Sequence, residues 1–338
     1  MPGSATLPFP SGRIVLKRAA MRHFLDFEKP IAELEGKIEE LRRMTEPEGV
    51  NIAEEVARLS EKTERQLRVI YAKLTPWQKT LVARHPERPK AMACITALLT
   101  EFTALAGDRA FADDAAVVGG LGRFRGRPVL VVGTEKGTDT ESRLKHNFGM
   151  ARPEGYRKAR RLAELAGRFG LPILTFVDTA GAFPGIDAEA RGQAEAIARS
   201  IEAFLDAPVP IVATITGEGG SGGAIALAAA DRILMLEHAI YSVISPEGCA
   251  SILWREAQAA EQAAEALKLT AEDLKRLELI DAIVPEPLGG AHRDPEAAIA
   301  AMGDAIAAAL EPLAGIEGPA LKARRREKFL AMGRDHGG

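Results

Sequence analysis

The feature that most constrains the fold is a glycine-rich junction between two apolar runs. Residues 211–216 form a β-branched run typical of a strand buried on both faces, and residues 224–230 are small enough for a closely packed helix. Five glycines lie between them in Gly217-Glu-Gly-Gly-Ser-Gly-Gly223. Because glycine accepts positive φ and lets other groups approach the backbone, we expect a turn with outward N–H groups at a helix start. Such a turn favours negative charge.

Two common sequence motifs match residues 217–223. The glycines of residues 217–222 match the dinucleotide pattern G-x-G-x-x-G, and Glu237 follows about 20 residues later. The pattern G-x-S-x-G centred on Ser221 matches a nucleophile elbow, with Asp281 and His292 downstream in the order of an α/β-hydrolase. Each pattern is weak alone, because a segment with five glycines satisfies many patterns by chance.

A third interpretation is an oxyanion hole built from main-chain donors. Here Ser221 is only a small residue, and the amides around Gly219, Gly220, Gly222 and Gly223 hold an anionic oxygen. A tight packing turn without chemistry would use the same glycines.

Beyond Gly107, predicted strands and helices alternate with a period of about 40 residues, which indicates parallel strands with their loops at one end. The expected strands are residues 129–132, 172–177, 211–216, 232–236 and 240–243, and the expected helices are 154–169 and 187–205. A second glycine segment, residues 181–185, would then lie beside residues 217–223, where α/β folds bind ligands. Paired amide-rich segments suit an enzyme that holds one anionic oxygen while a second substrate approaches, which favours the oxyanion hole.

The N-terminal third is predicted to be helical. Residues 28–44 and 53–74 carry narrow apolar stripes, which suggests a helical hairpin resting on the main domain, on a partner chain, or only on itself. Another helix is expected over residues 91–106. We therefore divide the chain into a disordered leader, a helical region, a core domain and a tail. The respective ranges are 1–20, 21–106, 107–313 and 314–338.

Charge and cysteine content limit the function further. Lys and Arg number 44 against 47 Asp and Glu, so the net charge of −3 gives no global attraction to nucleic acid or anionic membrane. The two cysteines, Cys94 and Cys249, lie far apart, which argues for a reduced compartment and against a structural zinc site. The basic run at residues 322–328 is expected to be an exposed tail helix, with a nucleic-acid role left open.

Five motifs stand out along the chain, at residues 24–35, 147–150, 217–224, 241–254 and 279–293. Together they closely resemble the family of carboxyltransferase alpha subunits of bacterial acetyl-CoA carboxylase. The resemblance covers about residues 21–313, and the motifs occur in the family's order. Ala180 stands where the family commonly has proline, Phe183 where it has tyrosine, and Thr138 where a basic residue is common. The loss of the tyrosine hydroxyl argues against a role for Phe183 beyond packing.

The resemblance implies an α/β fold of the crotonase-like type, a ββα spiral core with an N-terminal helical hairpin. It implies a cytoplasmic enzyme that moves the carboxyl group of carboxybiotin, held on a carrier protein, to acetyl-CoA, giving malonyl-CoA for fatty acid biosynthesis. The implied partners are a zinc-carrying beta subunit in an alpha2-beta2 heterotetramer, the biotin carboxyl carrier protein and the ATP-dependent biotin carboxylase. A related acyl-CoA, such as propionyl-CoA, is the alternative substrate.

The site hypothesis combines the resemblance with the glycine junction. The four glycine amides would stabilise the ureido oxygen of biotin, so no side-chain base is needed. Glu218 and Ser221 would only shape the turn through hydrogen bonds to the backbone. Substrate contacts are expected from the second glycine segment and from basic side chains, although the latter fit a solvated face or, for Arg191, pairing with Glu189 or Glu195. These candidates are Gly181, Ala182, Phe183, Gly185, Lys136, Arg143 and Arg191.

Overall fold

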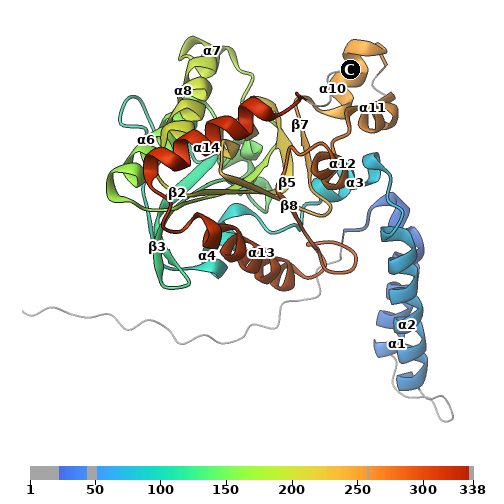
Figure 1. The fold of residues 1–338 in the computed structure, drawn as a ribbon. Coiled ribbons are helices and arrows are strands. Elements are labelled where there is room, and N and C mark those ends of the chain that lie inside the picture. Colours follow the sequence, from blue (N-terminus) through green and yellow to red (C-terminus); the bar gives the residue numbers. More distant parts are fainter. Residues whose placement is uncertain (1–22, 44–51, 257–258, 335–338) are drawn as a thin grey trace, which may run out of the picture.

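The computed structural model describes residues 23–43, 52–256 and 259–334 (Figure 1). The predicted leader and the break between the first two helices lie outside these ranges. A central sheet is covered by α6 (Pro153–Phe169), α8 (Gln193–Asp206) and α14 (Gly318–Ala331) on one side, and by α4 (Ala91–Leu98) and α13 (Pro295–Leu310) on the other.

The sheet has an antiparallel end and a parallel body, in the order β1-β2-β3-β4-β5-β6-β8, with β7 pairing β5 beyond the end of β6. The first three strands are antiparallel, and the remaining pairs are parallel. The strands are β1 (Leu99–Ala104), β2 (Val117–Phe124), β3 (Arg127–Thr134), β4 (Ile173–Thr179), β5 (Ile211–Gly220), β6 (Arg232–Leu236), β7 (Ile240–Ser242) and β8 (Ala282–Val284).

Most predicted elements are confirmed, and two helices are corrected. The helix expected over residues 91–106 ends at Leu98, and β1 follows because its β-branched and aromatic residues pair with β2. The helix expected over 187–205 is split into α7 (Ile186–Ala190) and α8. The cause is Gly192, whose φ of 82° lies outside the helical region.

The N-terminal hairpin, α1 (Lys29–Arg43) and α2 (Ile52–Tyr71), projects away from the sheet in Figure 1. Its two helices pack against each other through a small apolar cluster that includes Leu34, Ile38 and Leu59. At its base, Tyr71 and its neighbours pack on α3 (Pro76–Ala83). The hairpin therefore rests on its own chain at one end.

The C-terminal helix α14 is not the exposed tail that the basic run suggested. The Arg325 side chain is completely buried and forms two hydrogen bonds with Asp231, of 3.0 and 2.7 Å. Lys328 lies 2.5 Å from Asp281. These contacts lock α14 to the residues that precede β6 and β8.

Short elements complete the described chain. Within its described part, no single helix combines the length and apolarity of a membrane span; only α13 with η4 and α14 reach them jointly, across a bend of 115°. The remaining elements are η1 (Asp26–Glu28), α5 (Thr140–Lys145), η2 (Asn147–Gly149), α9 (Ser221–Ala228), α10 (Pro246–Leu253), α11 (Ala260–Leu267), α12 (Ala271–Arg276) and η4 (Glu311–Leu313).

Candidate functional site

The glycine junction is tighter than the sequence predicted. β5 continues through Gly220 and α9 begins at Ser221, so no separate loop joins them. None of the five glycines has a positive φ; the residue that does is Ser221, at 51°. The glycines are therefore not required for a left-handed turn, and that part of the prediction is wrong.

Close packing explains four of these glycines, and Gly222 is the one with room for a Cβ. A Cβ atom on Gly220 would lie 2.2 Å from the carbonyl oxygen of Ala180, and one on Gly223 would lie 2.6 Å from the carbonyl carbon of Gly181. Thr179 is the β4 partner of Gly219. The predicted side-by-side arrangement of the two glycine segments is confirmed, and their backbones are in direct contact.

The start of α9 offers unpaired main-chain donors. Gly220 is the N-cap and provides no side-chain cap. The first amides of a helix have no intrahelical acceptor, and those of Gly222 and Gly223 donate to no described residue outside α9, whereas Ser221 directly follows the pairing of Gly220 with Ser242 of β7. Gly219, by contrast, lies inside the sheet, aligned with strands on both sides. Free donors at a helix start favour an anionic oxygen.

A cavity of 330 Å³ opens beside the first turn of α9. Ser221 is exposed and Gly222 half-buried at this position, while Gly223 is covered. The other lining residues are predominantly apolar and come from α9, β6, β7, α12 and the end of α14. They are Ile225, Ile233, Tyr241, Ser242, Val243, Leu274, Leu279, Phe329 and Met332.

A buried carboxylate, Asp178, lies next to the junction at the end of β4. Its Oδ1 atom accepts a hydrogen bond from the Glu218 amide at 2.9 Å and lies 2.6 Å from the Lys136 ammonium group. Lys90 is 3.7 Å away. Burial by itself would raise the pKa of Asp178, but Lys136 and Lys90 more than offset this and lower it to about 2. The carboxylate therefore stays charged and fixes the backbone before Gly219.

Glu218 extends this network in the opposite direction. Its carboxylate lies 2.7 Å from Arg84 and 3.8 Å from Lys136, so the side chain pairs with cations instead of bonding to the backbone as expected. Arg84 also contacts Glu247 of α10 at 2.5 Å. The network contains three cations, Arg84, Lys90 and Lys136, and three carboxylates, Asp178, Glu218 and Glu247. Because the charges balance, the free-energy cost of burying them is limited.

The three basic candidates have different surroundings. Lys136 is held by Asp178 with only 17% of its side chain exposed. Arg191 pairs with Glu154 at 2.6 Å and with Asp187 at 3.3 Å, so the expected partners Glu189 and Glu195 are wrong. Arg143 on α5 is half-buried and has no side-chain partner among the described residues.

The second glycine segment, residues 181–185, differs from the junction in the space around its first glycine. Gly181 has φ of 148°, and an added Cβ would meet nothing closer than the Gly220 carbonyl oxygen at 4.0 Å. The Phe183 amide donates to Ala151, and the Arg152 guanidinium lies 4.8 Å from the ring centre. Ala182 packs against the core, and Gly185 caps α7.

The residues of the competing motifs lie apart. Ser221 has the strained strand-to-helix geometry of a nucleophile elbow, but His292 stacks on His85 at 3.8 Å and Asp281 pairs with Arg232 and Lys328. Burial lowers the pKa of His292 to about 2, so it is neutral. In the described chain these three side chains make no triad contacts. Glu237, required by the dinucleotide motif, accepts from the Glu286 amide.

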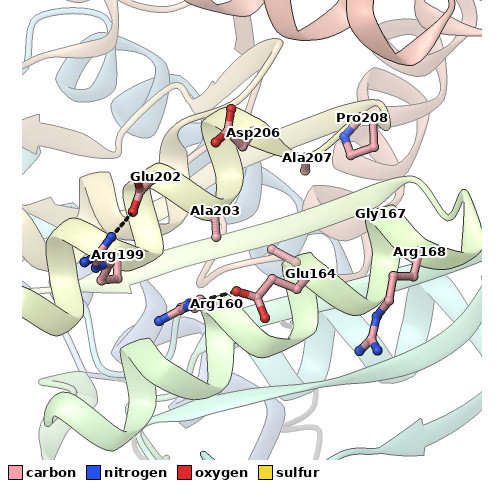
Figure 2. A pocket seen from close by; sticks show the side chains of 11 residues that line it. Arg160, Glu164, Gly167, Arg168, Arg199, Glu202, Ala203, Asp206, Ala207 and Pro208 are labelled. Carbon is pink, nitrogen blue, oxygen red and sulfur yellow. Dashed lines mark hydrogen bonds and ion pairs between the residues drawn. The ribbon is translucent and has the colours of Figure 1, made fainter.

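A separate hollow of 820 Å³ lies between α6 and α8 (Figure 2). Its wall carries the ion pairs Arg160–Glu164 and Arg199–Glu202, whose side chains are about half exposed. Ion pairs that are this exposed contribute little to the free energy of unfolding. The hollow shares no lining residue with the glycine junction.

Several site residues escaped the sequence analysis. Asp178 follows directly on a predicted buried strand, and a carboxylate at that position was a signal that could have revealed it. Phe329 and Met332 lie in the predicted tail, residues 314–338, and no local pattern places them at the cavity.

Comparisons with known proteins agree on one family. The family model described as acetyl co-enzyme A carboxylase carboxyltransferase-like matches residues 24–333. A protein of Acidiphilium cryptum (strain JF-5), named acetyl-coenzyme A carboxylase carboxyl transferase subunit alpha, is 72% identical over 93% of this chain and 98% of its own length. A protein of the same name from Gluconacetobacter diazotrophicus is 69% identical over 93% of this chain and 99% of its own length.

Solved structures show the same fold at low sequence identity. A Pseudomonas malonate decarboxylase hetero-tetramer in complex with coenzyme A aligns with a TM-score of 0.54 at 18% identity, over 67% of this chain and 88% of the other. Transcarboxylase 12S, with methylmalonyl-coenzyme A bound, aligns with a TM-score of 0.52 at 20% identity, over 70% of this chain but 41% of the other. The predicted crotonase-like fold is confirmed. By its family model and its relatives, the chain belongs to the family of acetyl-coenzyme A carboxylase carboxyltransferase alpha subunits.

Proposed function

We propose that this chain transfers the carboxyl group of carboxybiotin to acetyl-CoA, and that the start of α9 stabilises the biotin oxygen during the transfer. When the N1–carboxylate bond of carboxybiotin breaks, CO2 leaves and negative charge develops on the ureido oxygen. N1 then takes a proton from the acetyl methyl group, and the resulting enolate carbon attacks CO2 to give malonyl-CoA. No side-chain base is required.

The observation that carries this proposal is the pair of unpaired amides at Gly222 and Gly223 in the first turn of α9, where Gly222 lines a cavity. Preorganised donors aimed at a developing oxyanion act without reorganisation, and removal of one typically raises the barrier by about 3 kcal/mol. Of the four glycines predicted for this role, Gly222 and Gly223 lie in the first helical turn. Gly219 and Gly220 fit a supporting role, because they belong to the paired strand.

The family also suggests the setting of the reaction. We infer a beta subunit that binds acetyl-CoA, a carrier protein that delivers biotin, and a separate ATP-dependent biotin carboxylase that reloads it. The cytoplasm suits this assignment, because Cys94 and Cys249 are free, buried thiols. Arg143 is the basic candidate that could meet a phosphate or carboxylate, since Lys136 and Arg191 are already paired.

A substitution at Gly222 tests the oxyanion role. An added Cβ would meet only Ile197, at 3.6 Å, so Gly222→Val is expected to fold while covering the donors. With the co-expressed beta subunit, we expect carboxyl transfer from malonyl-CoA to free biotin to fall about 10²-fold or more in kcat. Bulky replacement of Gly219 is a poorer test than the sequence suggested, because its Cβ would lie 2.9 Å from the Tyr241 ring.

Gly36→Val is the matched control. Gly36 lies on α1, and a Cβ there would meet nothing within 4 Å. An unchanged kcat in a folded Gly222→Val enzyme would contradict the oxyanion role. A wild-type complex without any carboxyl transfer would contradict the proposed reaction itself.

A further inference from the structure

The C-terminal helix α14 forms one wall of the cavity beside α9. Lys328 and Phe329 lie three and four residues after Arg325, and Met332, the C-cap residue, lies four and three residues after them, so all four are on one side of the helix end. Arg325 and Lys328 are anchored to the residues that precede β6 and β8, and Phe329 and Met332 line the same cavity as Ser221. In Figure 1, α14 runs across the sheet toward β7.

The Arg325 guanidinium, which anchors α14, has an acceptor for each of its N–H groups. Besides Asp231, the guanidinium donates to the carbonyl oxygens of Phe204, Ala207 and Val209, each at 2.8 Å. Asp231 in turn accepts from the Ile211 amide at the start of β5. A planar group with every N–H engaged fixes the rotation and the axial position of its helix.

Lys328 adds a second anchor one turn later. Its ammonium group contacts Asp281 and donates to the Asp231 carbonyl oxygen at 3.1 Å. Asp281 also accepts from the Ile233 amide at 2.7 Å, and Ile233 lines the cavity. The wall made by Phe329 and Met332 therefore has a defined position relative to the sheet, although both side chains are only half-buried.

The cavity combines a polar edge with an apolar interior. Its lining includes Gly222, whose amide is unpaired, the Ser221 side chain, and the apolar residues Phe329, Met332 and Leu279. A matching occupant has one hydrogen-bond acceptor on a compact, otherwise apolar body. The ring system of biotin has this character, with a ureido oxygen on fused rings that are mostly carbon and sulfur.

We propose that Phe329 and Met332 are specificity-determining residues that hold the biotin ring against the start of α9, with Arg325 and Lys328 as their positioning residues. This proposal rests on the proposed function, because that function supplies biotin as a substrate. It gives the C-terminal helix a part in substrate selection that the basic run did not suggest.

Kinetics of the wild-type chain with its beta subunit provide the first test. Removing apolar contact area from one substrate weakens the binding of that substrate alone, so Phe329→Ala should raise the KM for free biotin roughly tenfold and Met332→Ala roughly threefold. The KM for malonyl-CoA in the same reaction should stay constant. Leu330→Ala is the matched control, because Leu330 is 53% exposed on the same helix.

Thiol labelling provides a second test that does not depend on turnover. The two natural cysteines are buried, so in Met332→Cys the new thiol is the one expected to react with a maleimide. Free biotin should slow this labelling several-fold or more, and should leave the labelling of Leu330→Cys unchanged.

The outcomes separate the two proposals. A rise in the KM for malonyl-CoA instead of biotin, or equal labelling of Met332→Cys with and without biotin, would overturn the assignment of the cavity. Protection by biotin in a complex that transfers no carboxyl group would support the biotin wall and refute the proposed reaction.

Discussion

The two glycine segments are in contact, yet they contain glycine for different reasons. In residues 217–223 the backbone has ordinary negative φ at every glycine, and the limit is space, since Gly220 and Gly223 have no room for a Cβ. At Gly181, in residues 181–185, the limit is conformation, since φ is 148° and the space around the α-carbon is open, whereas Gly185 is again limited by space, with a Cβ that would lie 2.2 Å from the Phe183 ring. A glycine in a sequence therefore does not reveal which of these two constraints it satisfies.

Loss of the carboxylate that joins the two segments should have the largest effect. Asp178 precedes residues 181–185 and fixes residues 217–223 through the Glu218 amide. Asp178→Ala leaves Lys136 and Lys90 buried without their shared partner, so we expect the free energy of unfolding to fall by about 3–5 kcal/mol in urea denaturation. Asp187→Ala, which removes an exposed partner of Arg191, should cost less than about 1 kcal/mol. Equal losses would contradict a linking role for Asp178.

Gly220→Ala tests the constraint of space. Its Cβ would lie 2.2 Å from the Ala180 carbonyl oxygen, which is backbone and cannot move aside freely. We expect a loss of about 3 kcal/mol or more in unfolding free energy. Gly222→Ala, two residues away with its nearest neighbour at 3.6 Å, should change stability by less than about 1 kcal/mol. If both variants unfold at the same denaturant concentration, steric crowding does not explain these glycines.

Gly181→Ala tests the constraint of conformation. No atom obstructs the new methyl group, so the expected loss of about 2 kcal/mol comes only from forcing alanine to φ of 148° or from shifting the loop. Thermal unfolding measures this loss, and a crystal structure of the variant would show a changed φ at residue 181. A stability equal to wild type with φ unchanged would contradict the argument.

Acid should weaken the link between the segments by a smaller amount. The pKa of Asp178 is lowered from 3.8 to about 2, so its contribution is complete above about pH 4 and is lost as the pH falls toward 2. At pH 3 we expect a loss of about 1 kcal/mol relative to pH 7 from this group. The difference between wild type and Asp178→Asn, measured by denaturation from pH 5 to 2.5, should shrink accordingly. A constant difference would show that the charge of Asp178 is not stabilising.

Local sequence patterns predicted the parallel body of the sheet well. The apolar runs became β4, β5 and β6, and α6 ends at Gly170 with φ of 65°, as glycine at that position indicates. These elements depend on short-range periodicity and on end signals, which a sequence displays directly. The alternation of strand and helix then brought the two glycine segments together.

Other features depend on residues far apart in the chain. β1 was taken for helix because its pairing with β2 is not visible in residues 91–106. Lys136 was expected to face substrate, and the partner that buries it, Asp178, is about 40 residues away. Arg325 lies in a basic run whose composition predicts solvent exposure. Its acceptor, Asp231, is separated from it by even more residues of the chain. Propensity cannot anticipate such pairs, because tertiary packing decides them.

The sequence by itself determined the family, the alternating architecture and the position of the glycine junction, because each is recorded in motifs and periodicities of a few dozen residues. Only the tertiary structure decided why those glycines are needed, which amides of α9 remain unpaired, and that α14 closes a cavity beside them. The physical reason is that steric exclusion and hydrogen-bond satisfaction are relations between atoms of distant segments. They exist only once the chain has folded.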